Sequence, residues 1–465
     1  MTPHDLQDDR LRALLGDIML SDSMMSTLHV LCDVIGKRSA GSEAEANARD
    51  FLVSEFERFG LANARAEPFK APHWRRGVTT ARMIAPVDKQ IELLALPLNR
   101  SHRVSAEVAP VSFRTEEEFE RVASQLEGKI CINLGETTTG AGKDVLHRSE
   151  RIRLAHRAGA AAFLWSSHIP GHVLPTGSMN MEIAKEMPAF GITLEDARML
   201  ERFMEHGHTV SLEIDTANEL REGTSWNVVA DLPGDSSDAP WVYVSAHYDS
   251  HDITTGAYDN AAGTAIVLEC ARVFANHYAR AGCNVRFIVF SAEEVSLVGS
   301  TRYVEQHADE LSGIRFLLNA DGLGVAPSRK YIHVPFHGRA ASYIRGVYQR
   351  YGYSVDVDNA INLNWDHAPF AVRGVPVGSI TAKGRPGQLL HYGHTVSDSL
   401  DKIDAQDMRY AACCTALLAH QFAVDDDCPV TQLSEDEIRS AASEARPGAL
   451  ELWLPGSTAA AASAR

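Results

Sequence analysis

The chain has 465 residues, of which 45% are hydrophobic and 23% are charged, a composition typical of soluble globular proteins. This length is sufficient for two or three domains. The formal net charge is −17, and no block rich in Lys and Arg occurs. Nucleic acid and anionic membrane surfaces are therefore not expected as partners.

The amino terminus and the cysteines indicate a cytoplasmic protein. The first twenty residues, MTPHDLQDDRLRALLGDIML, are acidic where a signal peptide needs a basic start and an apolar core. No apolar run approaches the roughly 20 residues that a transmembrane helix requires. The seven Cys residues are scattered, odd in number and without a CxxC pair, so no disulfide framework is expected.

The first 77 residues are expected to contain helices followed by a strand. Residues 24–34 carry apolar side chains at helical spacing, and a second helix is expected after Ser42. Glu45 lies three residues after Ser42, which predicts a capping box, and Gly60 stands where a glycine ends a helix. Residues 62–69 are expected to form a strand.

From about residue 78 the pattern changes to short β-like runs, which predicts an inserted domain over 78–218. The segment RSERIRLAHRAGAAAFLW, residues 148–165, is expected to be helical. It is followed by a loop over 166–187 that is rich in Gly, Pro, His and Met. Its His and Met side chains are expected at the surface: His168, His172, Met179 and Met181.

From residue 224 onward, strand and helix patterns alternate, which predicts an α/β sandwich with a largely parallel sheet. The expected strands are SWNVVADL, WVYVSAH, NVRFIVFSA, RFLLNADG, YIHVPF and VPVGSIT, and the expected helices are 261–279, 295–308, 338–351, 366–373 and 405–423. Residues 429–465 are acidic and then rich in Ala and Ser, so the end of this tail is expected to be disordered.

Four loops that follow strands carry His or carboxylate residues, and such loops bind ligands in open α/β sheets. The residues are His247, Asp249, His251, Asp252 and Asp259 in the first loop, Glu293 and Glu294 in the second, Asp321 in the third, and His391 and His394 in the fourth. Each loop alone has an ordinary explanation as a turn or a helix cap. Together, imidazole and carboxylate side chains at one sheet edge suit zinc, with other divalent metals as alternatives.

The ordered motifs HYDS, GAYDNAAG, SAEE, NADG and GHTVSDSLDKID resemble those of the co-catalytic di-zinc aminopeptidase family. This resemblance covers nearly the whole chain, and EPFKAPHWRRG is similar to the carboxypeptidase Q branch in particular. It implies a three-layer α/β sandwich with a mostly parallel mixed central sheet, the zinc exopeptidase fold, built from residues 1–77 and 219–428. It also implies that residues 78–218 are a small β-rich protease-associated domain.

The resemblance further implies roles for individual residues. Asp259 would bridge two Zn²⁺ ions, or Co²⁺ or Mn²⁺ in their place. One ion would be completed by His247 and Asp321, and the other by Glu294 and His394. Asp249 would accept the second ring N–H of His247, and Glu293 would be the general base. Asn260 stands where many members have a second Asp, and His251 and His391 are rival ligands.

The implied function is hydrolysis of short peptides or dipeptides by an aminopeptidase or dipeptidase. The alternatives are a carboxypeptidase or an amidase for N-acylated amino acids, and further a glutaminyl cyclase-like or non-catalytic member. Three residues are candidates for substrate contacts: Tyr392 as an oxyanion donor, Asp366 toward an amine, and Arg385, with Lys383 nearby, toward a carboxylate. Packing, helix capping and solvated loop charge are their ordinary explanations. A homodimer is left open, and the 166–187 loop is expected to lean over the site and exclude long chains.

Overall fold

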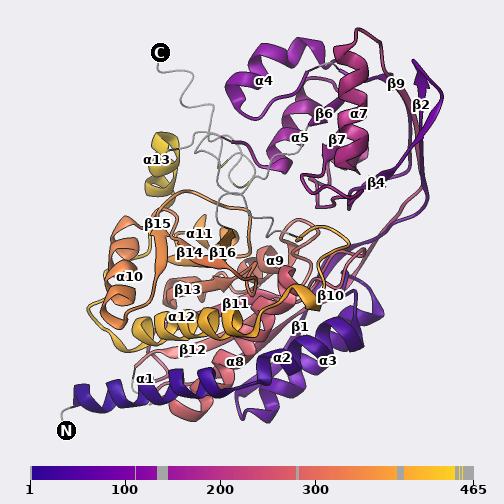
Figure 1. Ribbon diagram of the computed structural model, residues 1–465. Helices are drawn as coiled ribbons and strands as arrows, with labels where there is room; N and C mark the ends of the chain where they lie inside the picture. The colour runs from indigo at the N-terminus through magenta and orange to yellow at the C-terminus, as the bar shows by residue number, and fades with distance from the viewer. Residues whose placement is uncertain are drawn as a thin grey trace.

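The computed structural model describes residues 3–109, 111–133, 145–278, 282–384 and 392–445, together with Leu450 and Trp453. Eight strands of this part form a central sheet in the order β1-β10-β12-β11-β13-β16-β14-β15 (Figure 1). In that order their bounds are Ala62–Arg75, Glu219–Leu232, Asn284–Phe290, Trp241–His247, Ile314–Ala320, Val377–Gly384, Ser328–His333 and Val355–Asp358.

The middle strands β12, β11, β13 and β16 run parallel to one another, whereas β10 and β14 are antiparallel to their neighbours β12 and β16. His247 at the end of β11 pairs with Phe290 at the end of β12, and Ser245 pairs with Asn319 near the end of β13. The loops that leave these three strands therefore start side by side at one edge of the sheet.

Helices cover both faces of the sheet. The helices around it are α1 Pro3–Leu20, α2 Ser23–Leu28, α3 Glu43–Arg58, α8 Ala262–His277, α9 Val298–Gln306, α10 Gly338–Tyr351, α11 Ala368–Ala371, α12 Ala405–Val424 and α13 Glu435–Ala445. Short helical turns lie at η1 His29–Ile35, η3 Ala257–Ala261, η4 Leu311–Gly313 and η5 Leu400–Lys402. Val242 and Val244 are buried with α1, α2, α3, α8, α10 and α12, whereas Tyr243 is buried with α9, α11 and α13. Alternate strand residues thus face opposite layers, which confirms the predicted α/β architecture with a mixed central sheet.

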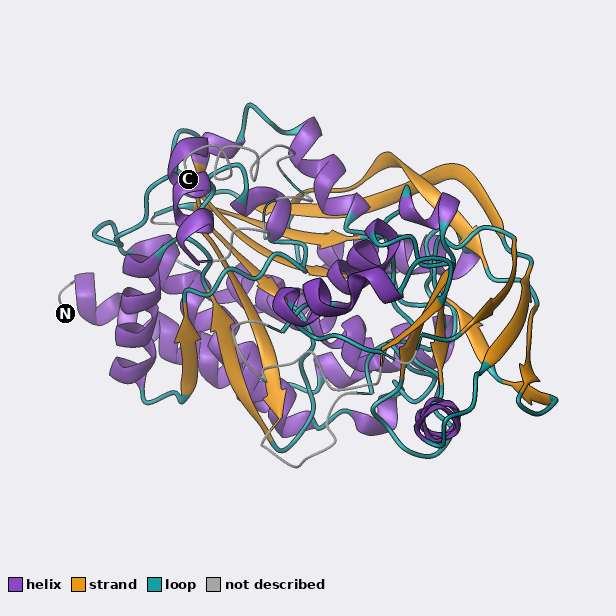
Figure 2. Cartoon of the chain, turned by 90° about the horizontal axis from the view of Figure 1, so that it is seen from above, coloured by secondary structure: helices purple, strands orange, loops and turns teal. Residues whose placement is uncertain are grey.

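Residues 79–216 form two smaller sheets that lie beyond one side of the central sheet (Figures 1 and 2). One has the order β3-β2-β9-β5 and the other β4-β8-β7-β6. Their strands are β2 Thr79–Ala85, β3 Lys89–Ile91, β4 Leu93–Ala95, β5 His102–Glu107, β6 Ile130–Asn133, β7 Ala162–Ser166, β8 Ala189–Ile192 and β9 Ser211–Thr216. Their helices are α4 Glu116–Val122, α5 Arg148–Arg157, α6 Ile183–Glu186 and α7 Leu194–Glu205, with the turn η2 Ala123–Gln125. The long paired strands β1 and β10 lead into and out of this insertion.

Several predicted boundaries shift. The helix predicted over 148–165 ends at Arg157, because Gly159 has a φ of 74° and residues 162–166 continue as strand β7. The helix predicted from 295 starts at Val298, because Ser296 and Leu297 both have positive φ. The helix predicted over 366–373 covers only 368–371.

The predicted capping box at α3 forms only in part. The Ser42 side chain accepts from the backbone N–H of Glu45 at 3.0 Å, as expected. The Glu45 carboxylate instead accepts from Gly41 N at 2.6 Å and from Ser291 Oγ at 2.5 Å. Gly60 has a φ of 75°, so it ends the helix as predicted.

Among the described residues, no single helix is long and apolar enough to cross a membrane. One bent pair, residues 9–20 and 23–35, passes the same criteria of length and composition when taken together, with an angle of 51° between its members.

Candidate metal centre and active site

The strand-end loops bring the predicted ligands together at one edge of the sheet. His247 is the last residue of β11, and Asp321 directly follows β13. Glu294 lies in the turn after β12, Asp259 lies in η3 before α8, and His394 lies before η5. This convergence follows from the parallel register of the three middle strands.

The first group of ligand-type atoms is His247, Asp259 and Asp321. Nε2 of His247 lies 3.2 Å from Oδ1 of Asp259 and 3.8 Å from Oδ2 of Asp321. The His247 side chain is 1% exposed and that of Asp321 is 5% exposed. The three donors thus surround one small buried space.

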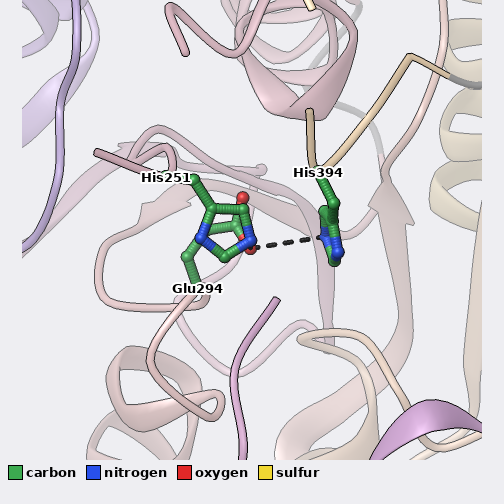
Figure 3. Close-up of side chains that lie close together, drawn as sticks. All are labelled: His251, Glu294 and His394. Carbon is green, nitrogen blue, oxygen red and sulfur yellow. Dashed lines mark ion pairs between the residues drawn. The ribbon is translucent and has the colours of Figure 1, made fainter. Parts of the chain in front are cut away.

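The second group is His251, Glu294 and His394, shown in Figure 3. Oε2 of Glu294 lies 2.8 Å from Nε2 of His251 and 3.5 Å from Nε2 of His394. The two imidazole rings meet edge to face with centroids 4.6 Å apart. His251 and His394 were rivals in the sequence, and the structure places both against Glu294.

Asp259 lies between the two groups. Its Oδ1 faces His247, and its Oδ2 lies 3.0 Å from Nε2 of His394. Each carboxylate oxygen therefore points at the imidazole of a different group, which is the arrangement that a bridging carboxylate needs.

The unpaired buried polar atoms of the site fit bound metal ions. Among the described residues, several buried nitrogen and oxygen atoms have no hydrogen-bond partner: Nδ1 and Nε2 of His247, Nε2 of His251, Oε1 of Glu294 and Oδ2 of Asp321. Buried polar atoms are normally paired. Several unpaired atoms around one space therefore indicate that a ligand binds there. Imidazole nitrogens with carboxylate oxygens are a donor set that fits Zn²⁺.

The carboxyl groups gathered in the site also favour the binding of cations. Burial raises the pKa of Glu294 well above its usual range, and the charges of Asp259 and Glu293 raise it further. Burial would raise the pKa of Asp259 as well, but its contacts with His247 and His394 hold this pKa well below its usual range. Divalent cations would favour the ionised form of all these carboxyl groups.

Asp249 holds the turn that carries the two adjacent Glu residues. Its Oδ1 and Oδ2 accept from the backbone N–H groups of Glu293 and Glu294, each at 3.1 Å. Its Oδ1 also lies 3.3 Å from Nδ1 of His247. Asp249 is thus placed to orient a candidate ligand and the candidate base together.

Three further residues position the site, a role that the sequence did not indicate for them. The Asp398 carboxylate accepts from the backbone N–H of Tyr258 at 2.7 Å and of Asp259 at 3.0 Å. The buried Arg38 guanidinium donates to five carbonyl oxygens, including those of Tyr248, Thr255 and Gly256 in the loop after β11. Asn260 donates to the carbonyl of Ala320 at 2.9 Å, a bond that an ionised Asp at this position could not donate. Motif spacing alone could have suggested only Asp398, which lies in the HTVSDSLDKID run.

The insertion contacts this site directly. The backbone N–H of Thr176 donates to the carbonyl of His394 at 2.8 Å, and Pro175 forms an isolated antiparallel bridge with Thr395. Ser296 donates to the carbonyl of Met179 at 3.2 Å. Met179 is only 1% exposed, so the prediction that it lies at the surface is wrong, because the 166–187 loop packs against the catalytic loops.

A cavity of about 850 Å³ opens beside the metal-ligand groups. It is lined from the central unit by Asp259, Glu293, Glu294, Asp321 and His394, and from the insertion by Arg148, Trp165, Thr176 and Met179 among others. A cavity of this size suits a small ligand rather than a long folded chain.

The residues that the sequence suggested for substrate contacts lie in different surroundings from one another. Tyr392 lies with its ring 5.3 Å from Nζ of Lys402 and is not among the residues that line the cavity. Asp366 is fully buried, and burial raises its pKa to about 7. Lys383 lines the cavity but lies 4.8 Å from the ring of Tyr331. Arg385, His391 and the carboxyl-terminal residues from 454 onward lie outside the described residues.

Comparisons with known proteins agree with this geometry. Residues 227–418 match the model of peptidase family M28, a range that contains every predicted metal ligand. Mouse carboxypeptidase Q is 27% identical over 412 residues, covering 86% of this chain and 85% of the mouse protein. The crystal structure of a peptidase M28 precursor from Shewanella amazonensis has a TM-score of 0.78 at 26% identity, covering 92% of this chain and 99% of that chain.

A zinc aminopeptidase from Bacillus subtilis, BSAP, shares the fold with a TM-score of 0.66 at 23% identity, covering 89% of this chain and 98% of that chain. These findings confirm the resemblance that the motifs indicated. Residues 227–418 thus match peptidase family M28, and the protein is a metallopeptidase that resembles carboxypeptidase Q.

Proposed function

We propose that this protein is a di-zinc exopeptidase that hydrolyses short peptides or dipeptides. The observation that carries the proposal is the position of Asp259, whose two carboxylate oxygens lie 3.2 and 3.0 Å from the imidazoles of His247 and His394. His247 and Asp321 would hold one ion with Asp259, while Glu294 and His394 would hold the other. Nε2 of His251, which faces Glu294, adds a donor to the second site.

Two zinc ions at such a site lower the pKa of the attacking water and stabilise negative charge on the scissile carbonyl. Glu293 is the base in this proposal, because it lines the cavity and is not among the ligand-type groups. Burial raises the pKa of Glu293 well above its usual range against the opposing charge of His247, and the charges of Asp366 and Asp321 raise it further. Nearby cations would lower this pKa, so that Glu293 can take a proton from water and deliver it to the leaving amine.

The insertion fits the role of a protease-associated domain that walls the substrate cavity. Its segment around Pro175 and Thr176 is bonded to the His394 loop, and its core contains Ala292 and Val295, which flank the two adjacent Glu residues. The separate sheets of the two parts support the division of the chain into 1–77 with 219–428, and 78–218. The cytoplasmic location and the homodimer stay predictions.

The experiment that tests this function is metal analysis combined with a substrate screen. The purified protein is expected to hold about two Zn²⁺ per chain and to lose hydrolysis of free dipeptides on chelation, with recovery when Zn²⁺ is restored. About one ion per chain would instead favour a glutaminyl cyclase-like enzyme, and none a non-catalytic member. Amino-terminally blocked peptides and aminoacyl amides in the same screen separate carboxypeptidase or amidase activity from aminopeptidase activity.

The 166–187 loop is expected to limit substrate length, because it lines the cavity next to His394. In a series from dipeptide to octapeptide, kcat/KM of the wild type should fall with length. Shortening residues 168–174, while keeping Pro175 and Thr176, should raise kcat/KM for octapeptides and leave the zinc content unchanged. A wild type that cleaves octapeptides as well as dipeptides would contradict this gating role and leave the metal chemistry intact.

A further inference from the structure

The insertion places a buried cation inside the active-site cavity. Arg148, the first residue of α5, is 7% exposed and lines the cavity. Its Nη1 lies 3.2 Å from Nδ1 of His394, while Nε and Nη2 each lie 3.4 Å from the carbonyl oxygen of Ser178. Within the described residues this guanidinium forms no ion pair with a carboxylate.

The fold leaves space specifically for this guanidinium. Gly177 has a φ of 135°, and a Cβ atom at that position would lie 2.2 Å from Cζ of Arg148. A side chain at 177 would therefore strain the backbone and would make the Arg148 guanidinium shift from this position. The loop that contacts His394 is thus also the loop that accommodates Arg148.

A buried guanidinium that pairs with no carboxylate among the described residues is costly, which points to an anionic ligand. A guanidinium keeps its charge at neutral pH even when buried, and the carboxylates whose charges favour this state are those of Glu294, Glu293 and Asp259. The proposed function uses those three carboxylates for the ions and for proton transfer. They do not form hydrogen bonds with Arg148.

Metal binding would also remove the acceptor that Arg148 has now. Nδ1 of His394 can accept from Nη1 only in the tautomer that carries its proton on Nε2. When Nε2 of His394 binds a metal, Nδ1 of the neutral ring carries the proton and becomes a donor. The Arg148 guanidinium and this N–H then both need an acceptor in the same part of the cavity.

We propose that Arg148 binds the terminal carboxylate of the substrate residue that leaves, so that the enzyme requires a free carboxyl group next to the scissile bond. This assignment rests on the proposed function. It narrows the proposed substrates to dipeptides and carboxypeptidase-type substrates. A guanidinium fork matches a carboxylate with two parallel hydrogen bonds. Consecutive Cα atoms are about 3.8 Å apart. Because Arg148 contacts His394 at 3.2 Å, its guanidinium is close enough to the metal-ligand groups to reach a carboxylate one residue from the reacting carbonyl.

The test compares a dipeptide with its carboxyl-terminal amide, using the zinc-loaded full chain. Wild type should prefer the free acid, and Arg148→Gln should lower kcat/KM for the acid by about 100-fold, because a buried charge pair loses one partner. The amide should change by less than about threefold, so the preference for the acid disappears. Arg148→Lys should recover part of the loss, since the charge stays while the fork is lost.

Arg153→Gln is the matched control, because it removes a cation from the same helix and the same cavity wall. It should leave the acid-to-amide ratio unchanged, and all variants should keep their zinc content and melting temperature. An equal loss on acid and amide for Arg148→Gln would show that Arg148 positions His394 instead, and no loss on either would also overturn the proposal. A wild type that hydrolyses neither substrate would refute the proposed function itself.

Discussion

Glu293→Gln is expected to keep both metal ions and the fold, yet to lose about 10²–10⁴-fold in kcat. The substitution preserves the size of the side chain and the backbone N–H that donates to Asp249, but the amide cannot accept a proton from water. The measurements are zinc per chain, melting temperature and kcat on the best dipeptide of the screen.

Glu294→Gln is the control for this variant, because the two residues are adjacent and both donate a backbone N–H to Asp249. Glu294 faces His251 and His394, so its substitution should release zinc, and added Zn²⁺ should restore part of the activity. If Glu293→Gln releases zinc and Glu294→Gln keeps it, the two roles are exchanged.

Asp259→Ala should release more metal than any other single substitution, because Asp259 alone faces an imidazole of each group. The protein should remain folded, since removal of one buried carboxylate also relieves repulsion with Glu294. Zinc per chain after gel filtration, measured at a fixed free Zn²⁺ concentration, is expected to fall from about two to below one, and turnover is expected to fall to the background rate.

Asp252→Ala provides the matched control from the same loop. Its carboxylate pairs with Arg76 at 2.7 Å and faces neither group, so this variant should keep a full pair of ions. His251→Gln should weaken the binding of the second ion only. A full pair of ions retained in Asp259→Ala would rule out the bridging role.

Part of the candidate site could be predicted from the sequence, because its ligand-type residues lie at the ends of apolar strands or in the loops that follow them. His247 ends β11 and Asp321 follows β13, and parallel strands place such residues at one sheet edge whatever the details of packing. The helix starts were less predictable. Val298 begins α9 only after a turn with positive φ at Ser296 and Leu297, a conformation that propensity disfavours for these residues.

The choice between His251 and His394 required the structure. Both follow strand-end motifs, and no spacing rule shows that each would face Glu294 from a different side. The same holds for Tyr392, whose position next to His394 in the chain does not turn its ring toward the cavity.

The sequence by itself determined the α/β class and the motifs that match the M28 family, because hydrophobic period and local motifs encode these features. The inserted domain and the roles of the metal-ligand residues stay predictions. Only the tertiary structure decided what the insertion contributes to the site. Arg148 and His394 are 246 positions apart, and their contact depends on the packing of the 166–187 loop against the His394 loop. A local pattern cannot encode such a contact, since it arises from the path of the whole chain.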